Sequence, residues 1–207
     1  MISRPRNRGG FTLLELTLAL TLLTLFGLKV SSVISTTTKG TQTDIQQTRI
    51  DAQARHVLRR IGFAIMGSHP SSLDPNMPAP LNQSSIRFQV NLGISDGEIV
   101  WTQPETVALN EETGQVVWSE ESGGAVDRKV VWTSIAAPYL EGELPNGIDD
   151  NGNGLIDEKG LAISIQGDAI SLKLTLEHHA QDGRVLSSTV ETVVSCRNAV
   201  EGWRTAE

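Results

Sequence analysis

A short acidic stretch in the second half of the chain has the residue types and spacing of a calcium-binding loop. It covers residues 146–158 and reads Asn-Gly-Ile-Asp-Asp-Asn-Gly-Asn-Gly-Leu-Ile-Asp-Glu. If Asp149 is the first position, Asn151 and Asn153 fall at the third and fifth, and Gly154 follows at the sixth. In the pattern D-x-[DN]-x-[DN]-G, alternate oxygens converge on Ca²⁺, and the glycine allows a sharp turn. The spacing therefore predicts a structural Ca²⁺ site.

The end of this loop departs from the EF-hand pattern. The twelfth position, where an EF-hand has a bidentate glutamate, is Gly160, and no helical pattern flanks the loop. Asp157 or Glu158 must then complete the ligand shell, or Asp149 and its neighbour must both contribute. The loop is therefore more similar to the compact aspartate/asparagine calcium loops of extracellular bacterial domains than to an EF-hand. A weak affinity, on the order of 10⁻⁵ to 10⁻³ M, is expected for such a site.

The remaining positions of the loop complete this interpretation. Leu155 is expected to offer its main-chain carbonyl, and Ile156 is expected to turn into the core and anchor the loop. The alternative is a turn cluster without an ion, in which the carboxylates repel one another and only Lys159 offsets them. The predicted ligands are Asp149, Asn151, Asn153, Leu155, Asp157 and Glu158.

A second pattern lies at the N-terminus. A leader of residues 1–10 carries three arginines and ends in Gly10, and an apolar run of 20 residues follows from Phe11 to Val30. About 20 helical residues cross a hydrocarbon core, so this run predicts a transmembrane helix. The arginines are expected to remain cytoplasmic and to direct the rest of the chain outward.

A single glutamate, Glu15, lies inside the apolar run. A carboxylate at membrane depth costs about 2.5–3.5 kcal/mol, so it needs a partner. A secretory signal peptide does not fit, because its small-residue cleavage site follows the apolar core. A plain signal anchor explains the arginines and the length but leaves Glu15 without a role. Cleavage after Gly10 creates an α-amino group on Phe11, and Glu15 of one subunit is placed to pair with that amine of a neighbour.

The junction Gly10-Phe11-Thr12-Leu13-Leu14-Glu15 resembles the class III leader junction of type IV pilins and type II secretion pseudopilins. The resemblance implies that a prepilin peptidase cleaves after Gly10 and N-methylates Phe11, and that Glu15 is the assembly residue. It implies a single-pass protein of the bacterial inner membrane with a periplasmic C-terminal domain, assembled with other pilin or pseudopilin subunits. A J-type minor pseudopilin of type II secretion is the most similar kind of subunit.

The remaining sequence predicts an α+β fold, with the long N-terminal helix packed on an antiparallel β-meander in a pilin-like arrangement. Apolar residues between 54 and 65 recur at three- and four-residue steps, as on one face of a helix. Residues 31–54 are rich in threonine and remain compatible with a helix, but predict a poor one, either frayed or solvated. The predicted segments are a leader (1–10), a transmembrane half-helix (11–30), a periplasmic half-helix (31–67), a loop (68–84), a β-domain (85–197) and a flexible tail (198–207).

Three short β-rich runs each place a tryptophan after a β-branched pair: residues 98–102, 115–119 and 129–133. Turn residues separate these runs, which is typical of consecutive antiparallel strands. Packing within the sheet is the favoured role for the tryptophans, rather than a sugar-binding platform. Residues 161–165, 169–176 and 186–196 predict two further hairpins.

Composition limits the possible functions. The net charge of −7 becomes −10 without the three leader arginines, which disfavours nucleic acid as a partner. Cys196 is the single cysteine, so no internal disulfide can form. The sequence has no nucleophile elbow, no phosphate loop and no helical pair of metal-binding histidines, so we do not expect an enzyme. The alternative to a structural subunit is a filament-tip adhesin or ligand-binding module that uses the calcium loop.

Overall fold

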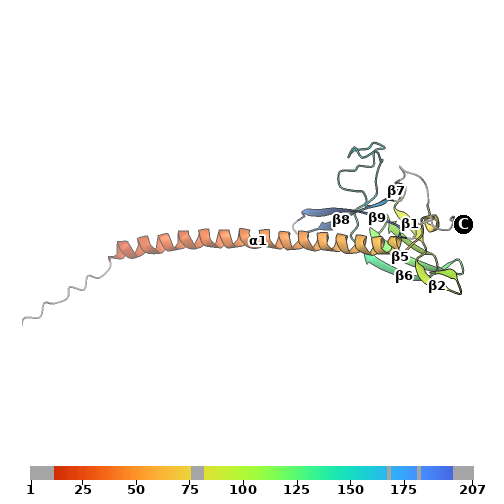
Figure 1. Cartoon of the computed structure of the whole chain (residues 1–207). Coiled ribbons are helices and arrows are strands. Elements are labelled where there is room, and N and C mark those ends of the chain that lie inside the picture. The colour runs from red at the N-terminus through yellow and green to blue at the C-terminus, as the bar shows by residue number, and fades with distance from the viewer. Residues whose placement is uncertain (1–11, 76–81, 167–168, 181–182, 198–207) are drawn as a thin grey trace, which may run out of the picture. The chain divides into compact units, whose positions relative to one another are not determined.

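A computed structural model describes residues 12–75, 82–166, 169–180 and 183–197 of the chain. One long N-terminal helix and antiparallel β-sheets form the structure, which confirms the predicted α+β class (Figure 1). The chain divides into two compact units, residues 1–45 and 46–207, and each is described by itself. The predicted leader, the cleavage site at Gly10 and Phe11, and the predicted tail lie outside the described residues.

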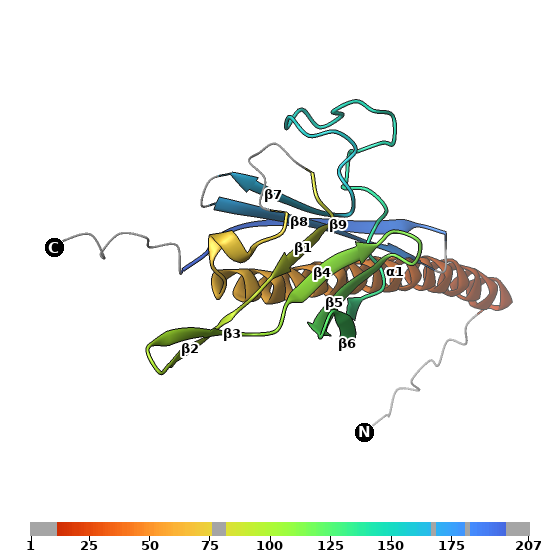
Figure 2. The ribbon, with the colours of Figure 1, turned by 90° about the vertical axis from the view of Figure 1, so that its right-hand side faces the viewer.

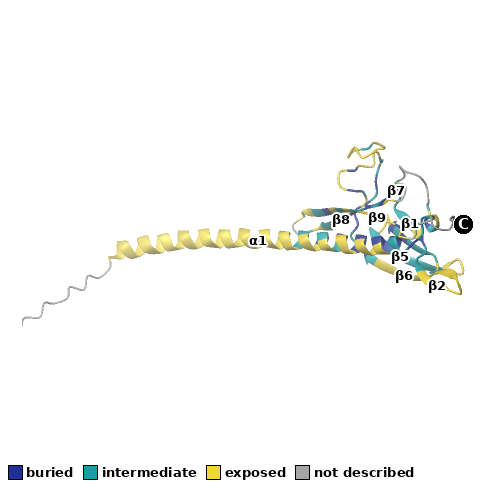
Figure 3. Ribbon diagram, in the orientation of Figure 1, coloured by how far each residue is buried: buried dark blue, intermediate teal, exposed yellow. Residues whose placement is uncertain are grey.

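Helix α1 runs from Leu13 to Met66 and has 54 residues. A capping box begins it: Thr12 N donates to Glu15 Oε2 at 2.9 Å, and Glu15 N donates to Thr12 Oγ1 at 3.2 Å. In the first unit every side chain from Thr12 to Thr38 is exposed, including nine leucines (Figure 3). By length and composition, α1 is the helix of the described chain that is able to cross a membrane.

The threonine-rich part of α1 is helical throughout, and its described residues are mostly exposed. Thr36, Thr37 and Thr38 each donate their hydroxyl group to the carbonyl four residues earlier, at 2.9 to 3.0 Å. These bonds satisfy the hydroxyl groups within the helix, and such back-bonding destabilises a helix only slightly. Low helix propensity therefore did not interrupt α1.

In the second unit, α1 buries the predicted apolar stripe. Of the predicted positions, Ala54, Val57, Leu58, Ile61 and Ile65 are buried and Ala64 is partly buried. Ile50, one turn before the predicted stripe, is buried as well. Arg55 lies off this stripe and pairs with Asp51, four residues earlier, at 2.9 Å. This hydrogen bond lowers the pKa of Asp51 below its usual range. The helix ends at Met66, and the short 3₁₀ helix η1 (Pro70–Ser72) follows, with His69 as its N-cap.

The strands form three separate antiparallel sheets. The four-stranded sheet has the order β1-β4-β5-β6, the two-stranded sheet is the hairpin β2-β3, and the three-stranded sheet has the order β7-β8-β9. The strands are β1 (Ser85–Phe88), β2 (Asn91–Ser95), β3 (Glu98–Trp101), β4 (Glu105–Asn110), β5 (Gln115–Ser122), β6 (Ala125–Thr133), β7 (Leu161–Gln166), β8 (Ala169–His179) and β9 (Val185–Ser195).

One core joins the two larger sheets to the second half of α1. Phe88 and Val107 contribute from the four-stranded sheet, Leu172 and Leu174 from the three-stranded sheet, and Ile61 from the helix. All five side chains are fully buried. Figure 2 shows strands of both sheets lying along α1. Main-chain hydrogen bonds between residues 83 and 163, at 2.7 and 3.2 Å, link the sheets at one edge.

The sheet topology differs from the single meander expected. Strands β2 and β4 were not predicted, and the run at residues 98–102 pairs with β2 rather than with the next tryptophan run. The first tryptophan strand, β3, belongs to the two-stranded sheet, whereas the other two, β5 and β6, belong to the four-stranded sheet. The place beside β5 is taken by β4. Trp118 and Trp132 pack partly buried against the core, which agrees with the packing role expected for them.

Candidate metal-binding loop

The acidic loop lies in the connection between β6 and β7, which contains no helix. Main-chain hydrogen bonds fix both of its ends. Ala137 N donates to Thr175 O at 2.9 Å, and Leu140 N donates to Glu158 O at 2.9 Å. Thr175 N donates to Gly160 O at 2.8 Å. Strand β8 therefore positions the loop, although it follows the loop in the sequence.

Asp149, the first position of the predicted calcium pattern, organises the turn. Its carboxylate accepts the main-chain N–H groups of Gly152 at 2.6 Å, Asn153 at 3.1 Å and Gly154 at 2.7 Å. These donors, Gly154 foremost, lower the pKa of the Asp149 carboxyl below its usual range. These bonds close a tight turn from Asp149 to Gly154, within the stretch where the sequence places the calcium pattern.

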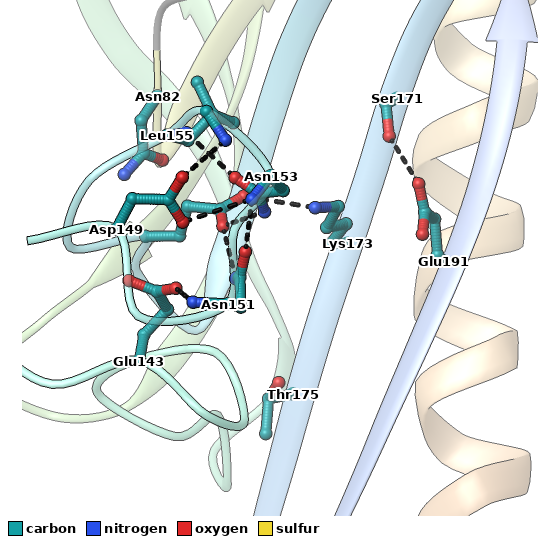
Figure 4. Close-up of polar contacts among 12 residues, drawn as sticks. Asn82, Glu143, Asp149, Asn151, Asn153, Leu155, Ser171, Lys173, Thr175 and Glu191 are labelled. Carbon is teal, nitrogen blue, oxygen red and sulfur yellow. Dashed lines mark hydrogen bonds and ion pairs between the residues drawn. The ribbon is translucent and has the colours of Figure 1, made fainter.

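Glu158 is the centre of a polar network and has no exposed surface. Its Oε2 atom accepts the side-chain amides of Asn151, at 3.0 Å, and of Asn153. Its Oε1 atom lies 3.3 Å from Lys173 Nζ on strand β8 (Figure 4). The structure thus brings four predicted ligands into one hydrogen-bonded arrangement: Asp149, Asn151, Asn153 and Glu158.

Three other residues of the predicted loop behave differently. The Asp157 carboxylate accepts the main-chain N–H groups of residues 146 and 147 at 3.1 Å, so it closes a separate turn. Leu155 N donates to Asn153 Oδ1 at 2.9 Å. Ile156 is 54% exposed, so the expectation that it enters the core was wrong. The main-chain bonds to strand β8, rather than an apolar side chain, anchor the loop.

Two residues outside the predicted pattern contribute polar groups to the loop. Glu143 is only 6% exposed, and its Oε1 atom accepts Asn151 N at 3.2 Å. Its Oε2 atom is buried without a hydrogen-bond partner in the described part of the chain. Asn82 donates to the carbonyl of Ile156 at 3.1 Å, and its Oδ1 atom is likewise buried without a partner among the described residues. Neither belongs to the motif, so the spacing gave no signal for them.

The charge near the loop also differs from expectation. Lys159, expected to offset the carboxylates, lies 3.0 Å from Glu111 and 3.1 Å from the Tyr139 hydroxyl. These contacts, with Glu111 the larger cause, raise the pKa of Lys159. Lys173 compensates Glu158 instead. It lies 15 residues after Glu158 and reaches the loop only because β8 lies beneath it.

Gly160, at the position of the EF-hand glutamate, has a packing role. A Cβ atom at this residue would lie 2.7 Å from the carbonyl carbon of Ala137 and closer still to its oxygen. Both neighbouring atoms belong to the main chain and cannot rotate away. The two loop ends meet here, so any side chain at residue 160 is excluded.

The oxygen-rich groups of this loop suit a hard cation such as Ca²⁺. In the described parts of the chain, no cluster of three or more His, Cys, Asp or Glu side chains is arranged to hold a metal ion. The groups available to a cation here would be two buried carboxylates, Glu143 and Glu158, with amide and main-chain oxygens. The orphaned oxygen of Glu143 is the observation that fits an ion at this position.

A hollow of about 260 Å³ lies beside the loop, above the three-stranded sheet. Asn153 and Leu155 line it from the loop, and Ser171, Lys173 and Glu191 line it from the strands (Figure 4). Ser171 donates to Glu191 at 3.1 Å across the pair β8-β9.

Comparison with known proteins gives no relative for the chain: no family model, no curated protein and no solved structure matches it.

Proposed function

We propose that the chain is a structural subunit of a pilus-like filament, a minor pilin-like protein or pseudopilin, assembled from the inner membrane. The observation that carries the proposal is helix α1, whose first half exposes an apolar surface and whose second half packs on the sheets of the second unit. The same helix begins directly after the leader junction Gly10-Phe11. A structural role, rather than catalysis, accounts for these features.

The exposed apolar half of α1 needs an apolar environment. Its large side chains from Leu13 to Ile34 are 41% to 81% exposed, and water is an unfavourable solvent for such a surface. A bilayer covers these side chains before assembly, and helices of neighbouring subunits cover them in a filament. The predicted orientation then places the second unit in the periplasm.

Glu15 has two partners in this proposal. Within the chain, its carboxylate accepts hydrogen bonds from Thr12 N at 2.9 Å and Thr12 Oγ1 at 3.0 Å. These bonds hold the carboxylate against the first turn of α1. In the filament, the methylated amine of Phe11 from a neighbouring subunit supplies the opposite charge, which lowers the cost of a carboxylate in lipid.

Co-expression with a prepilin peptidase/N-methyltransferase tests the processing step. We expect the intact mass to show loss of residues 1–10 and gain of one methyl group on Phe11. Gly10→Leu should retain the leader, whereas Gly9→Ala is a matched control that should be processed. A wild-type chain that keeps its leader beside an active peptidase would refute the proposed function.

Incorporation into filaments tests the assembly step. We expect Glu15→Ala to be cleaved normally but to be lost from sheared filaments of a host that also supplies the other subunits. Thr17→Ala lies within the same apolar run and serves as the control that should still assemble. Equal incorporation of both variants would remove the role assigned to Glu15.

A ligand-binding role at the filament tip is the second candidate, and the hollow beside the loop favours it. In that case, variants lining the hollow, such as Glu191→Gln, should assemble normally and lose adhesion. Loss of assembly together with adhesion would instead assign the loop to subunit packing.

A further inference from the structure

Two buried carboxylates of the loop meet at one residue. Glu158 has no exposed surface, and Glu143 is 6% exposed. The main-chain N–H of Asn151 donates to Glu143 Oε1 at 3.2 Å, and its side-chain amide donates to Glu158 Oε2 at 3.0 Å. Each carboxylate therefore lies one hydrogen bond away from Asn151. Figure 4 shows Lys173 pointing from strand β8 toward this loop.

The positive charge near these two carboxylates is less than their negative charge. Lys173 is the only described side chain that forms an ion pair with either of them, at 3.3 Å from Glu158. Lys159 is occupied by Glu111. One oxygen of Glu143 is buried without a donor in the described chain. Leaving a buried acceptor unpaired costs about 1–3 kcal/mol, and more for a charged group, so native proteins rarely retain one.

We propose that the loop binds one Ca²⁺ ion with Glu143 and Glu158 as its anionic ligands. Amide and main-chain oxygens of the loop, with water, complete the shell of six to eight oxygens that Ca²⁺ takes. The ion supplies the charge that Lys173 alone does not provide, and it gives the orphaned Glu143 oxygen a partner. An irregular loop with many oxygens suits Ca²⁺ better than Mg²⁺, which demands near-octahedral geometry.

This ligand set differs from the one that the motif alone predicts. The Asp157 carboxylate closes a separate turn with the N–H groups of residues 146 and 147. In the described chain no hydrogen bond connects it to Glu143, Asn151 or Glu158, so it is not included among the ligands. Lys173 competes with the ion, because its ammonium group already lies against Glu158. Removing this ammonium should tighten Ca²⁺ binding, whereas removing a true ligand should weaken it. The two substitutions therefore have effects of opposite sign.

The full chain in detergent, stripped with a chelator, is titrated with CaCl₂ by calorimetry, and thermal unfolding is measured with and without Ca²⁺. We expect wild-type binding with a Kd on the order of 10⁻⁵ to 10⁻³ M. Glu143→Gln and Glu158→Gln should each weaken binding at least about tenfold, equivalent to about 1.4 kcal/mol. Glu112→Gln, an exposed carboxylate of the same unit, is the matched control that should bind normally. Lys173→Met should bind Ca²⁺ more tightly than the wild type. Its Tm should be lower than that of the wild type only when Ca²⁺ is chelated.

The wild type is tested at a Ca²⁺ concentration about tenfold above the weakest expected Kd. If it then shows neither binding heat nor a Tm shift, the site is overturned. Retained affinity in both glutamine variants, with loss in Asp157→Asn, overturns this ligand set in favour of the motif residues. If Glu143→Gln does not fold, amide hydrogen exchange of the wild type decides instead. Chelation should accelerate exchange within residues 141–160, and unchanged exchange counts against the proposal. Neither result depends on the filament role.

Discussion

Replacing Gly160 by alanine tests how the candidate loop is closed. Gly160 is buried, and its main chain lies directly against that of Ala137. An added Cβ atom would lie 2.7 Å from the Ala137 carbonyl carbon and overlap the oxygen beyond it. Separation of the two chain segments is the only relief, because no side-chain rotation removes the overlap.

The cost follows from the hydrogen bonds that this separation breaks. Ala137 N donates to Thr175 O at 2.9 Å, and Thr175 N donates to Gly160 O at 2.8 Å. Each bond contributes about 0.5–1.5 kcal/mol net, and each buried group left unpaired costs about 1–3 kcal/mol. We therefore expect Gly160→Ala to lower the free energy of unfolding by about 3–5 kcal/mol, a large part of the usual total of about 5–15 kcal/mol.

Urea unfolding of the full chain in detergent, followed by tryptophan fluorescence, measures this loss as a lower midpoint at constant m. Gly142→Ala is the matched control in the same connection. Its φ is +90°, but nothing lies within 4 Å of an added Cβ, so we expect a cost of about 1–2 kcal/mol from the backbone alone.

Gly160→Glu distinguishes the packing seen in the structure from the EF-hand pattern in the sequence. An EF-hand interpretation expects this change to restore the twelfth ligand and improve Ca²⁺ affinity. The packing against Ala137 instead predicts that the variant does not fold. A stable Gly160→Ala protein that loses less than about 1 kcal/mol, or a Gly160→Glu protein that binds Ca²⁺ more tightly, would refute the reasoning.

Two further predictions use the same unfolding measurement, and a third uses amide hydrogen exchange. Ile61→Ala, at a fully buried helix position, should cost about 2–5 kcal/mol, whereas Phe63→Ala, 62% exposed, should cost far less; equal losses would show that the helix face is wrongly assigned. Because the Gly154 N–H lowers the Asp149 pKa, the unfolded state binds more protons, so this contribution is complete above about pH 4 and is lost as pH falls through the lower folded pKa. Asp149→Asn should therefore show a smaller fall in stability below pH 4 than the wild type, and an identical fall would contradict this. Thr12→Ala removes the capping box and should cost about 0.5–2 kcal/mol of helix stability, read as lower amide protection in the first turn of α1.

Local patterns in the sequence were sufficient for the helix and for the turn at Asp149. The stripe from Ala54 to Ile65 depends on the 3.6-residue period alone, and the structure buries most of it. The Asp149 turn depends on N–H groups within five residues, so its spacing predicts the geometry. Strand pairing was less predictable, because β4 separates the tryptophan strands and no local signal specifies that order.

The polar surroundings of the loop depend on contacts between distant parts of the chain. Lys173 reaches Glu158 because β8 follows β7 and pairs with it beside the loop. Lys159, the cation nearest in sequence, is instead drawn to Glu111. By itself, the sequence determined a long apolar-then-amphipathic helix and an acidic turn, because these depend on neighbours within a few residues. Only the tertiary structure decided which carboxylates are buried together, since burial and charge compensation are set by segments that the fold brings into contact.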